Sequence, residues 1–183
     1  LHLCSHNLES IDTTSMTTHK LLAEVCMAAK YEGESLVEKH KKFKKENSNF
    51  NTNICTVLAR SFADIGDIIR GKDLFRGYNE IDQEEKKQLQ DNLKDIFAKI
   101  HGKLGDSIKS NYNDTTDFFK LREDWWNANR LEVWKAITCH VVSGKYFRPT
   151  CGSGNNASAT YDKCQCANTD VPTNFDYVPQ YLR

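Results

Sequence analysis

The segment from Asn53 to Gly71 reads NICTVLARSFADIGDIIRG and decides the fold. Its apolar residues recur at spacings of three and four, the period of a helix with one buried face. They are Ile54, Leu58, Phe62, Ile65 and Ile69. Gly71 follows directly and can end the helix, because glycine adopts left-handed backbone angles without steric cost. The segment therefore predicts an amphipathic helix from about residue 53 to residue 69.

Three other segments have the same period. The first, from about residue 17 to 46, carries Leu22, Ala29, Leu36 and Phe43, with Gly33 as a weak point midway. The third runs from about 82 to 111, with Leu89, Leu93, Ile96, Ile100, Leu104 and Ile108 on one face. The fourth runs from about 116 to 140, with bulk from Phe118, Leu121, Trp125, Val133, Trp134 and Ile137. Asp82 is a candidate N-cap of the third helix, and Thr116 or Asp117 of the fourth.

Four amphipathic helices joined by short turns predict an all-α, disulfide-stapled helical bundle. The chain has 183 residues, enough for one domain with a sizeable core. All three prolines follow residue 148, so nothing breaks the helices before that point. The last stretch, residues 141 to 183, holds these prolines and three of the cysteines. It is expected to be irregular and pinned by disulfides.

Seven cysteines indicate an oxidising environment, and the odd count leaves at least one without an internal partner. Helices joined by short turns are antiparallel, so the first and fourth are expected to run in opposite directions. The start of the first would then lie beside the end of the fourth, which predicts a disulfide between Cys26 and Cys139. A bond from Cys26 to Cys55 is disfavoured, because a hairpin turning near residue 50 places them about 28 Å apart at the helical rise.

The sharpest candidate site is a cluster of five lysines in seven positions at the end of the first helix. They are Lys39, Lys41, Lys42, Lys44 and Lys45, while His40 and Phe43 are expected on the apolar face. Such a cluster can pair several sulfates of a polyanionic glycan at once. The alternative is a solvated face whose charge merely suits the C-terminal end of a helix. Arg70, Lys72 and Arg76 follow the second helix and form a possible second patch.

Other residues that suggest chemistry have simpler interpretations. Asp64 and Asp67 are expected to pair with Arg60 and Arg70 at helical spacing. Trp125 and Trp134 are expected to fill the core, or the seam to a neighbouring part, and Trp126 to pack on the C-terminal stretch, rather than to stack on a sugar.

Catalytic and metal chemistry find little support. Cys164-Gln165-Cys166, with Cys151 and His140, lacks the usual zinc spacing, so disulfides are favoured. The sequence has no catalytic, phosphate-binding or metal motif, so neither an enzyme nor a cofactor is expected. Zero net charge with many cysteines argues against nucleic acid. No apolar run is long enough to span or insert into a membrane.

Longer motifs carry a family resemblance that covers nearly the whole chain. The matching segments are Leu22–Cys26 with Ala28–Lys30 and Glu32-Gly33, Ala59–Gly71, Leu74–Gly77, Asp124–Arg130 with Val133-Trp134, and Val178–Arg183. The chain resembles a Duffy-binding-like domain of the alpha class, from the erythrocyte membrane protein 1 family of Plasmodium falciparum. In that family a central four-helix part lies between an irregular N-terminal part and a C-terminal helical part. The resemblance implies that residues 1–16 end the N-terminal subdomain and residues 17–183 form the central helical subdomain.

The resemblance also implies a place and a role. It implies exposure on the surface of the infected red cell and adhesion to host receptors on uninfected red cells, known as rosetting. The implied partners are heparan-sulfate-like glycans, blood-group sugars, complement receptor 1, antibodies and neighbouring domains of the same chain. The alternative is a scaffold or immune-evasion module with no receptor contact in this part of the domain.

Overall fold

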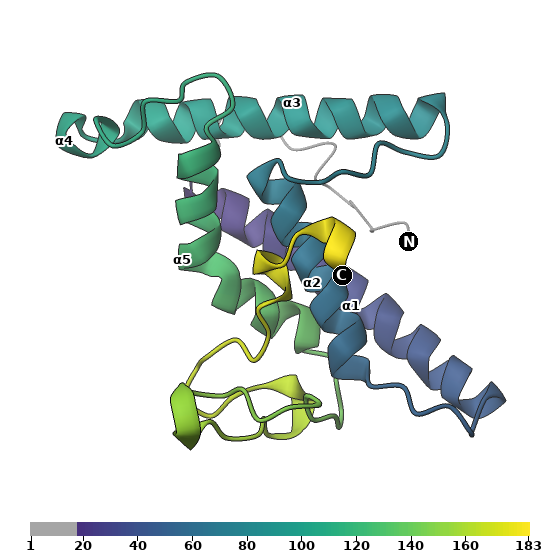
Figure 1. The fold of residues 1–183 in the computed structure, drawn as a ribbon. Helices are drawn as coiled ribbons and strands as arrows, with labels where there is room; N and C mark the ends of the chain where they lie inside the picture. The colour runs from purple at the N-terminus through teal and green to yellow at the C-terminus, as the bar shows by residue number, and fades with distance from the viewer. Residues whose placement is uncertain (1–17) are drawn as a thin grey trace.

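The computed structural model describes residues 18–183 and is all-α, as the sequence predicts (Figure 1). Its helices are α1 (Thr18–Glu46), α2 (Ile54–Arg70), α3 (Glu80–Lys103), α4 (Asp106–Lys109) and α5 (Phe119–Thr138). Short 3-10 turns follow: η2 (Gly154–Asn156), η3 (Asp162–Cys164), η4 (Phe175–Tyr177) and η5 (Gln180–Leu182). The proposed subdomain boundary at residues 1–16, and Cys4 with it, lies outside the described residues.

Helix α2 is the central element, and both its ends are defined by local chemistry. The side chain of Asn53 accepts hydrogen bonds from the backbone amides of Cys55 (2.9 Å) and Thr56 (3.3 Å), which satisfies donors of the first turn. Gly71 has φ 72° and ψ 24°, so the predicted glycine stop is confirmed. The helix is buried along most of its length, because α1, α5 and the C-terminal stretch all pack against it.

The directions of the helices follow from contacts along α2. Toward α1, Ser61 donates to Glu32 over 2.8 Å and Thr52 lies 3.0 Å from His40, so α1 and α2 are antiparallel. Toward α5, the Arg122 side chain bonds the carbonyl of Ile69, whereas Phe62 packs on Trp134. Helices α2 and α5 are therefore antiparallel too, and α1 and α5 run in the same direction.

The expected opposite directions of the first and last long helices are thus wrong, and the reason is α3. This helix does not take its place in an alternating bundle but lies across the end of the others (Figure 1). It contacts the start of α5 through Phe97 against Trp125 and through the Lys94–Asp117 ion pair at 2.8 Å. Because α3 runs crosswise, one alternation of direction is lost, and α5 runs parallel to α1 instead of antiparallel to it.

The predicted Cys26–Cys139 disulfide is consequently not formed. Both cysteines are free thiols. The α1–α5 register is set by Gly33, whose position lies against the backbone of Ile137. Cys139 therefore lies beside the part of α1 that follows Gly33, while Cys26 lies seven residues before it, about 10 Å toward the N-terminus at the helical rise. A disulfide requires Cα atoms within about 7 Å.

The cysteines bond elsewhere, and these bonds hold the last stretch as predicted. Cys55 at the start of α2 bonds Cys164, with a Cα–Cα distance of 5.5 Å. Cys151 bonds Cys166 within the cysteine-rich stretch, residues 141–183. The indole of Trp134 donates to the carbonyl of Cys164 over 3.0 Å, so this stretch is tied to α5 as well.

The third predicted helix is shorter than its apolar stripe. It ends at Lys103, and a break at residues 104 and 105 separates it from α4. Ile108 was expected on the buried face but is half exposed on α4. The N-cap is Asn79 and not Asp82: the Asn79 side chain accepts a hydrogen bond from the amide of Asp82, and the Asp82 carboxylate accepts one from the amide of Tyr78. Asp114, rather than Thr116 or Asp117, accepts the amides before α5.

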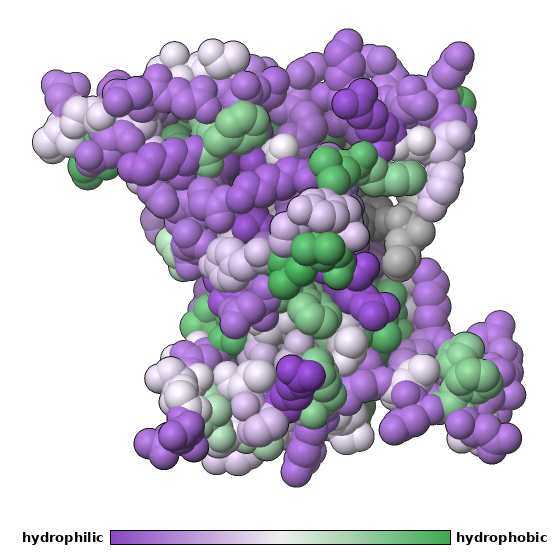
Figure 2. Space-filling model, in the orientation of Figure 1, coloured by the Kyte–Doolittle hydropathy of each residue, from purple (hydrophilic) through white to green (hydrophobic). Residues whose placement is uncertain are grey.

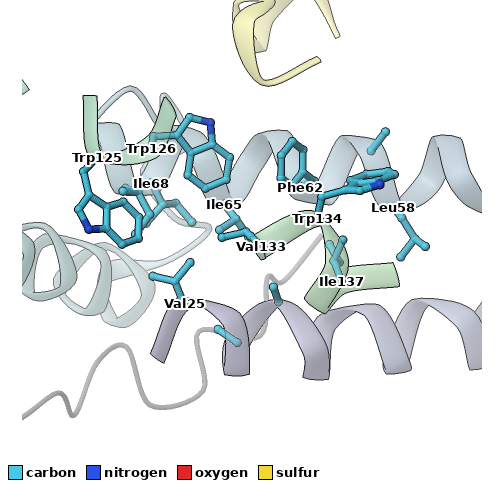
Figure 3. Close-up of a cluster of buried hydrophobic side chains, with 14 of the residues drawn as sticks. Val25, Leu58, Phe62, Ile65, Ile68, Trp125, Trp126, Val133, Trp134 and Ile137 are labelled. Atoms are coloured by element: carbon cyan, nitrogen blue, oxygen red, sulfur yellow. The ribbon is translucent and has the colours of Figure 1, made fainter. Parts of the chain in front are cut away.

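The core lies where α1, α2 and α5 meet, and its centre is aromatic (Figure 3). The ring of Phe62 lies 5.2 Å from Trp126 and 5.2 Å from Trp134, centroid to centroid. Gly66 makes room for this arrangement, since a Cβ there would lie 2.8 Å from the Trp126 ring. Trp125 and Trp134 are buried in the core as predicted, and Trp126 is buried as well, with its indole bonded to Asp176 of the C-terminal stretch.

Candidate functional site

The five predicted lysines lie on the exposed end of α1, residues 39–46, which we call the lysine arm. Figure 2 shows this end protruding from the body at lower right. All five lysines are exposed. None of the ion pairs within residues 18–183 uses any of them. Their charges are thus available to a ligand, and the partial negative charge of the helix end offsets part of their mutual repulsion.

His40 and Phe43, two of the three other residues of the arm, differ in their surroundings. His40 is half-buried, with its ring nitrogen 3.0 Å from the Thr52 hydroxyl. Burial lowers the pKa of His40, so the ring is neutral at pH 7. Phe43 was expected on a buried face, yet it is 40% exposed and packs only edge-on against Phe50, 6.1 Å away. The arm extends past the first turn of α2, so the bundle offers nothing there to cover Phe43.

An open groove of about 490 Å³ runs along one side of the arm, and we call it the arm groove. Its α1 side is formed by Val37, His40, Lys41, Lys44 and Lys45. The other sides are residues 51–54, from the connection into α2, and residues 141–144, which follow α5. Three of the five lysines therefore converge on a hollow.

The Cys55–Cys164 disulfide places the far wall of this groove. Gly144 packs against it, since a Cβ there would lie 3.3 Å from the Cys55 sulfur. The amide of Cys164 donates to the carbonyl of Gly144 over 2.9 Å, and Asn53 donates to the carbonyl of Lys145 over 2.8 Å. Residues 141–144 are therefore held beside the start of α2, opposite the lysines.

The second predicted patch is smaller than expected, because Arg70 is buried. Its side chain is 2% exposed and bonds Asp67, Glu123 and two backbone carbonyls, so it cannot reach a glycan. Lys72 is exposed but forms a 2.5 Å ion pair with Glu123. Arg76 is exposed. The patch thus reduces to Lys72 and Arg76.

A buried ionic network that the sequence did not reveal anchors the end of the chain. Asp176 accepts hydrogen bonds from Arg130 (2.7 and 2.8 Å) and from the indole of Trp126 (2.8 Å). Arg183 pairs with Asp64 and Asp67 on α2. The predicted Asp67–Arg70 pair is present at 3.1 Å, whereas Asp64 pairs with Arg183 and not with Arg60. The aspartates of this network thus serve as partners of buried or partly buried arginine side chains.

The remaining candidates for chemistry are structural as well. Cys151, Cys164 and Cys166 are all in disulfides. Within residues 18–183 no group of histidine, cysteine, aspartate or glutamate side chains is arranged to hold a metal ion. Burial raises the pKa of the Cys26 thiol to about 11, so this thiol is unreactive at neutral pH. None of the helices in the same range is apolar over a length that would cross a bilayer.

Comparison with known proteins gives matches over the whole chain. The family model described as "Duffy binding domain" matches residues 1–183. A solved NTS-DBL1-alpha and CIDR-gamma double domain of PfEMP1, from the Plasmodium falciparum varO strain, is 40% identical with a TM-score of 0.77. That match covers 99% of this chain and 25% of the other. An ICAM-1-binding PfEMP1 DBLbeta domain is 32% identical with a TM-score of 0.66, over 100% of this chain and 39% of its own.

A curated protein matches more weakly. The Duffy receptor gamma form of Plasmodium knowlesi is 29% identical over 99 residues, which are 54% of this chain and 7% of the receptor. The chain therefore spans well under half the length of each of these relatives.

Proposed function

The chain belongs to the Duffy binding domain family, whose members are adhesion modules and not enzymes, and from this premise we propose that it binds receptors on host red cells. The proposed setting is the surface of the infected red cell, and the proposed result is rosetting. The proposed ligand is a sulfated, heparan-sulfate-like glycan, and the proposed contact is the lysine arm. Blood-group sugars and complement receptor 1 are further proposed partners, for which no surface is assigned.

One observation carries the glycan proposal. Five lysines lie exposed on two turns of one helix, without ion pairs among the described residues. Unpaired cations at this spacing attract a regular polyanion, and counterion release makes such binding depend steeply on salt. Lys72 and Arg76 lie apart on the connection after α2 and are proposed only as a minor second contact.

Retention on a heparin column in rising salt tests this proposal. Replacing Lys41, Lys42, Lys44 and Lys45 with alanine is expected to abolish retention. The matched control replaces four lysines outside the arm, Lys30, Lys87, Lys103 and Lys109, and so removes the same charge. The control is expected to elute close to the unmodified chain. Equal losses for the two variants would show that net charge alone governs retention, and the arm would be withdrawn as the site.

A second candidate function is a docking face for a neighbouring domain of the same chain, the scaffold alternative. The observation that favours it is an apolar surface where residues 72–78 lie beside the chain end. Gln180 bonds both the amide of Leu74 and the side chain of Asp73, and Leu74, Tyr78, Tyr181 and Leu182 are exposed around this contact. Replacing Leu74 and Leu182 with serine is expected to weaken packing between domains in a longer chain while heparin retention is unchanged. If packing between domains is unchanged too, the scaffold alternative is withdrawn.

A further inference from the structure

The five lysines of the arm are not equivalent, because the helix turns them to different sides. One helical face, with three-four spacing, carries Val37, His40, Lys41, Lys44 and Lys45. These residues, three of them lysines, line the arm groove. Lys39 and Lys42 belong to the remaining arc and are not part of the lining. A polyanion attracted only by charge would not distinguish the two sets, whereas a ligand seated in the groove would.

The groove combines charge with an apolar floor and unused polar groups. Val37, Ile54 and Val141 are buried beneath it, and Val142 is exposed at its edge. Thr52 and Asn53 have their side chains bonded to His40 and to the backbone of residues 55, 56 and 145.

Two polar side chains remain available to a ligand. Asn51 and Ser143 also line the groove, they are exposed, and neither side chain has a partner among the described residues. The lining thus offers cations on one wall, aliphatic surface below and hydrogen-bonding groups at the edge.

Resting on the function proposed above, we propose that the arm groove seats a short sulfated segment of the glycan. Lys41, Lys44 and Lys45 pair with its sulfates, and the C–H face of a sugar ring lies on Ile54, Val141 and Val142. Asn51 and Ser143 bond its hydroxyl groups. Lys39 and Lys42 act only through long-range attraction. The groove volume lies within the range of about 300–1,000 Å³ that is usual for small-ligand sites.

Two double variants of equal charge separate this proposal from simple charge attraction. The probe is a heparin-derived tetrasaccharide, and the readout is its dissociation constant by calorimetry. Lys41→Ala with Lys44→Ala is expected to weaken binding about tenfold, since two direct contacts to sulfates are lost. Lys39→Ala with Lys42→Ala is expected to weaken it only about twofold, through reduced long-range attraction. Equal effects of the two pairs would overturn the proposal.

A groove-filling variant tests the same site with every lysine in place. Ser143→Trp puts a bulky ring at an exposed position of the lining. It is expected to abolish tetrasaccharide binding while helicity, measured by far-UV circular dichroism, is unchanged. Undiminished tetrasaccharide binding by Ser143→Trp would overturn the proposal, as would an unmodified chain that is retained on heparin but does not bind the tetrasaccharide. If the unmodified chain binds neither long-chain heparin nor the tetrasaccharide, the proposed function itself is wrong, and so is the proposed glycan site in the arm groove.

Discussion

Substituting Gly33 with alanine tests the closest approach of two helices in this fold. A Cβ at position 33 would lie 2.0 Å from the carbonyl oxygen of Ile137 and 2.8 Å from its carbonyl carbon. Carbon–oxygen contacts are ordinarily about 3.3 Å or longer, so α1 and α5 would have to separate by more than about 1 Å. The obstacle is backbone, which cannot rotate away as a side chain can.

The expected magnitude is the difference between two effects. Overpacking a buried contact costs about 1–3 kcal/mol, and a rigid obstacle places this site at the upper end of that range. Alanine in place of glycine inside a helix contributes about 1 kcal/mol in the opposite direction. The net loss for Gly33→Ala is therefore about 2 kcal/mol, which lowers the melting temperature of a chain of this size by about 4–8 °C.

Urea unfolding followed by far-UV circular dichroism measures this loss, and Gly102 supplies the control. Gly102 lies in the last turn of α3, and nothing lies within 4 Å of a Cβ placed there. Gly102→Ala is expected to leave stability unchanged or raise it by up to about 1 kcal/mol. If Gly33→Ala proves as stable as Gly102→Ala, the α1–α5 contact described here is wrong.

Three further perturbations have defined outcomes. Replacing Cys55 and Cys164 with alanine is expected to cost about 4.7 kcal/mol on the chain-entropy account, because the bond spans 109 residues. Removing the Cys151–Cys166 disulfide, which spans only 15 residues, should cost only about 3 kcal/mol. A lower urea midpoint for this variant than for the Cys55 and Cys164 variant would refute that reasoning. Asp176→Ala leaves Arg130 without its carboxylate and is expected to lower the free energy of unfolding by about 3–5 kcal/mol. A loss below about 1 kcal/mol would show that the network does not stabilise the fold. Burial raises the pKa of Asp64 to about 6 in the folded chain, compared with about 3.9 in the unfolded chain. The folded chain therefore binds this proton more tightly, and the stability that the proton contributes is fully present below about pH 4 and is lost as the pH rises through 6. Asp64→Asn should therefore reduce the fall in unfolding free energy between pH 5 and pH 7, and an unchanged fall would contradict this assignment.

The sequence predicts the helices well where their signals are local. The stripe of α2 and its glycine stop depend on residues a few positions apart, and both are confirmed. The break after α3 was missed because the apolar stripe continues to Ile108, beyond the residues that other helices cover.

Arrangements that depend on distant residues were not predictable from periodicity. The direction of α5 depends on α3 crossing the bundle, and nothing in the spacing of apolar residues specifies a crossing. The pairing of Cys55 with Cys164 and the free state of Cys26 follow from that geometry. Periodicity also cannot show that Arg70 turns inward, because its partners Glu123 and Asp176 lie far along the chain.

The candidate site likewise has one part that the sequence predicts and one part that depends on the fold. The lysine run is a local pattern and was found from sequence, and its exposure on the end of α1 is confirmed. The groove beside it needs residues 141–144, which only the fold and a disulfide bring to the helix.

Binding of the chain to uninfected red cells, measured by flow cytometry before and after heparinase treatment of the cells, tests the adhesive role most directly. Binding is expected to fall after heparinase and to be lost when Lys41, Lys42, Lys44 and Lys45 are replaced with alanine. Binding that survives both changes at full strength would contradict this expectation.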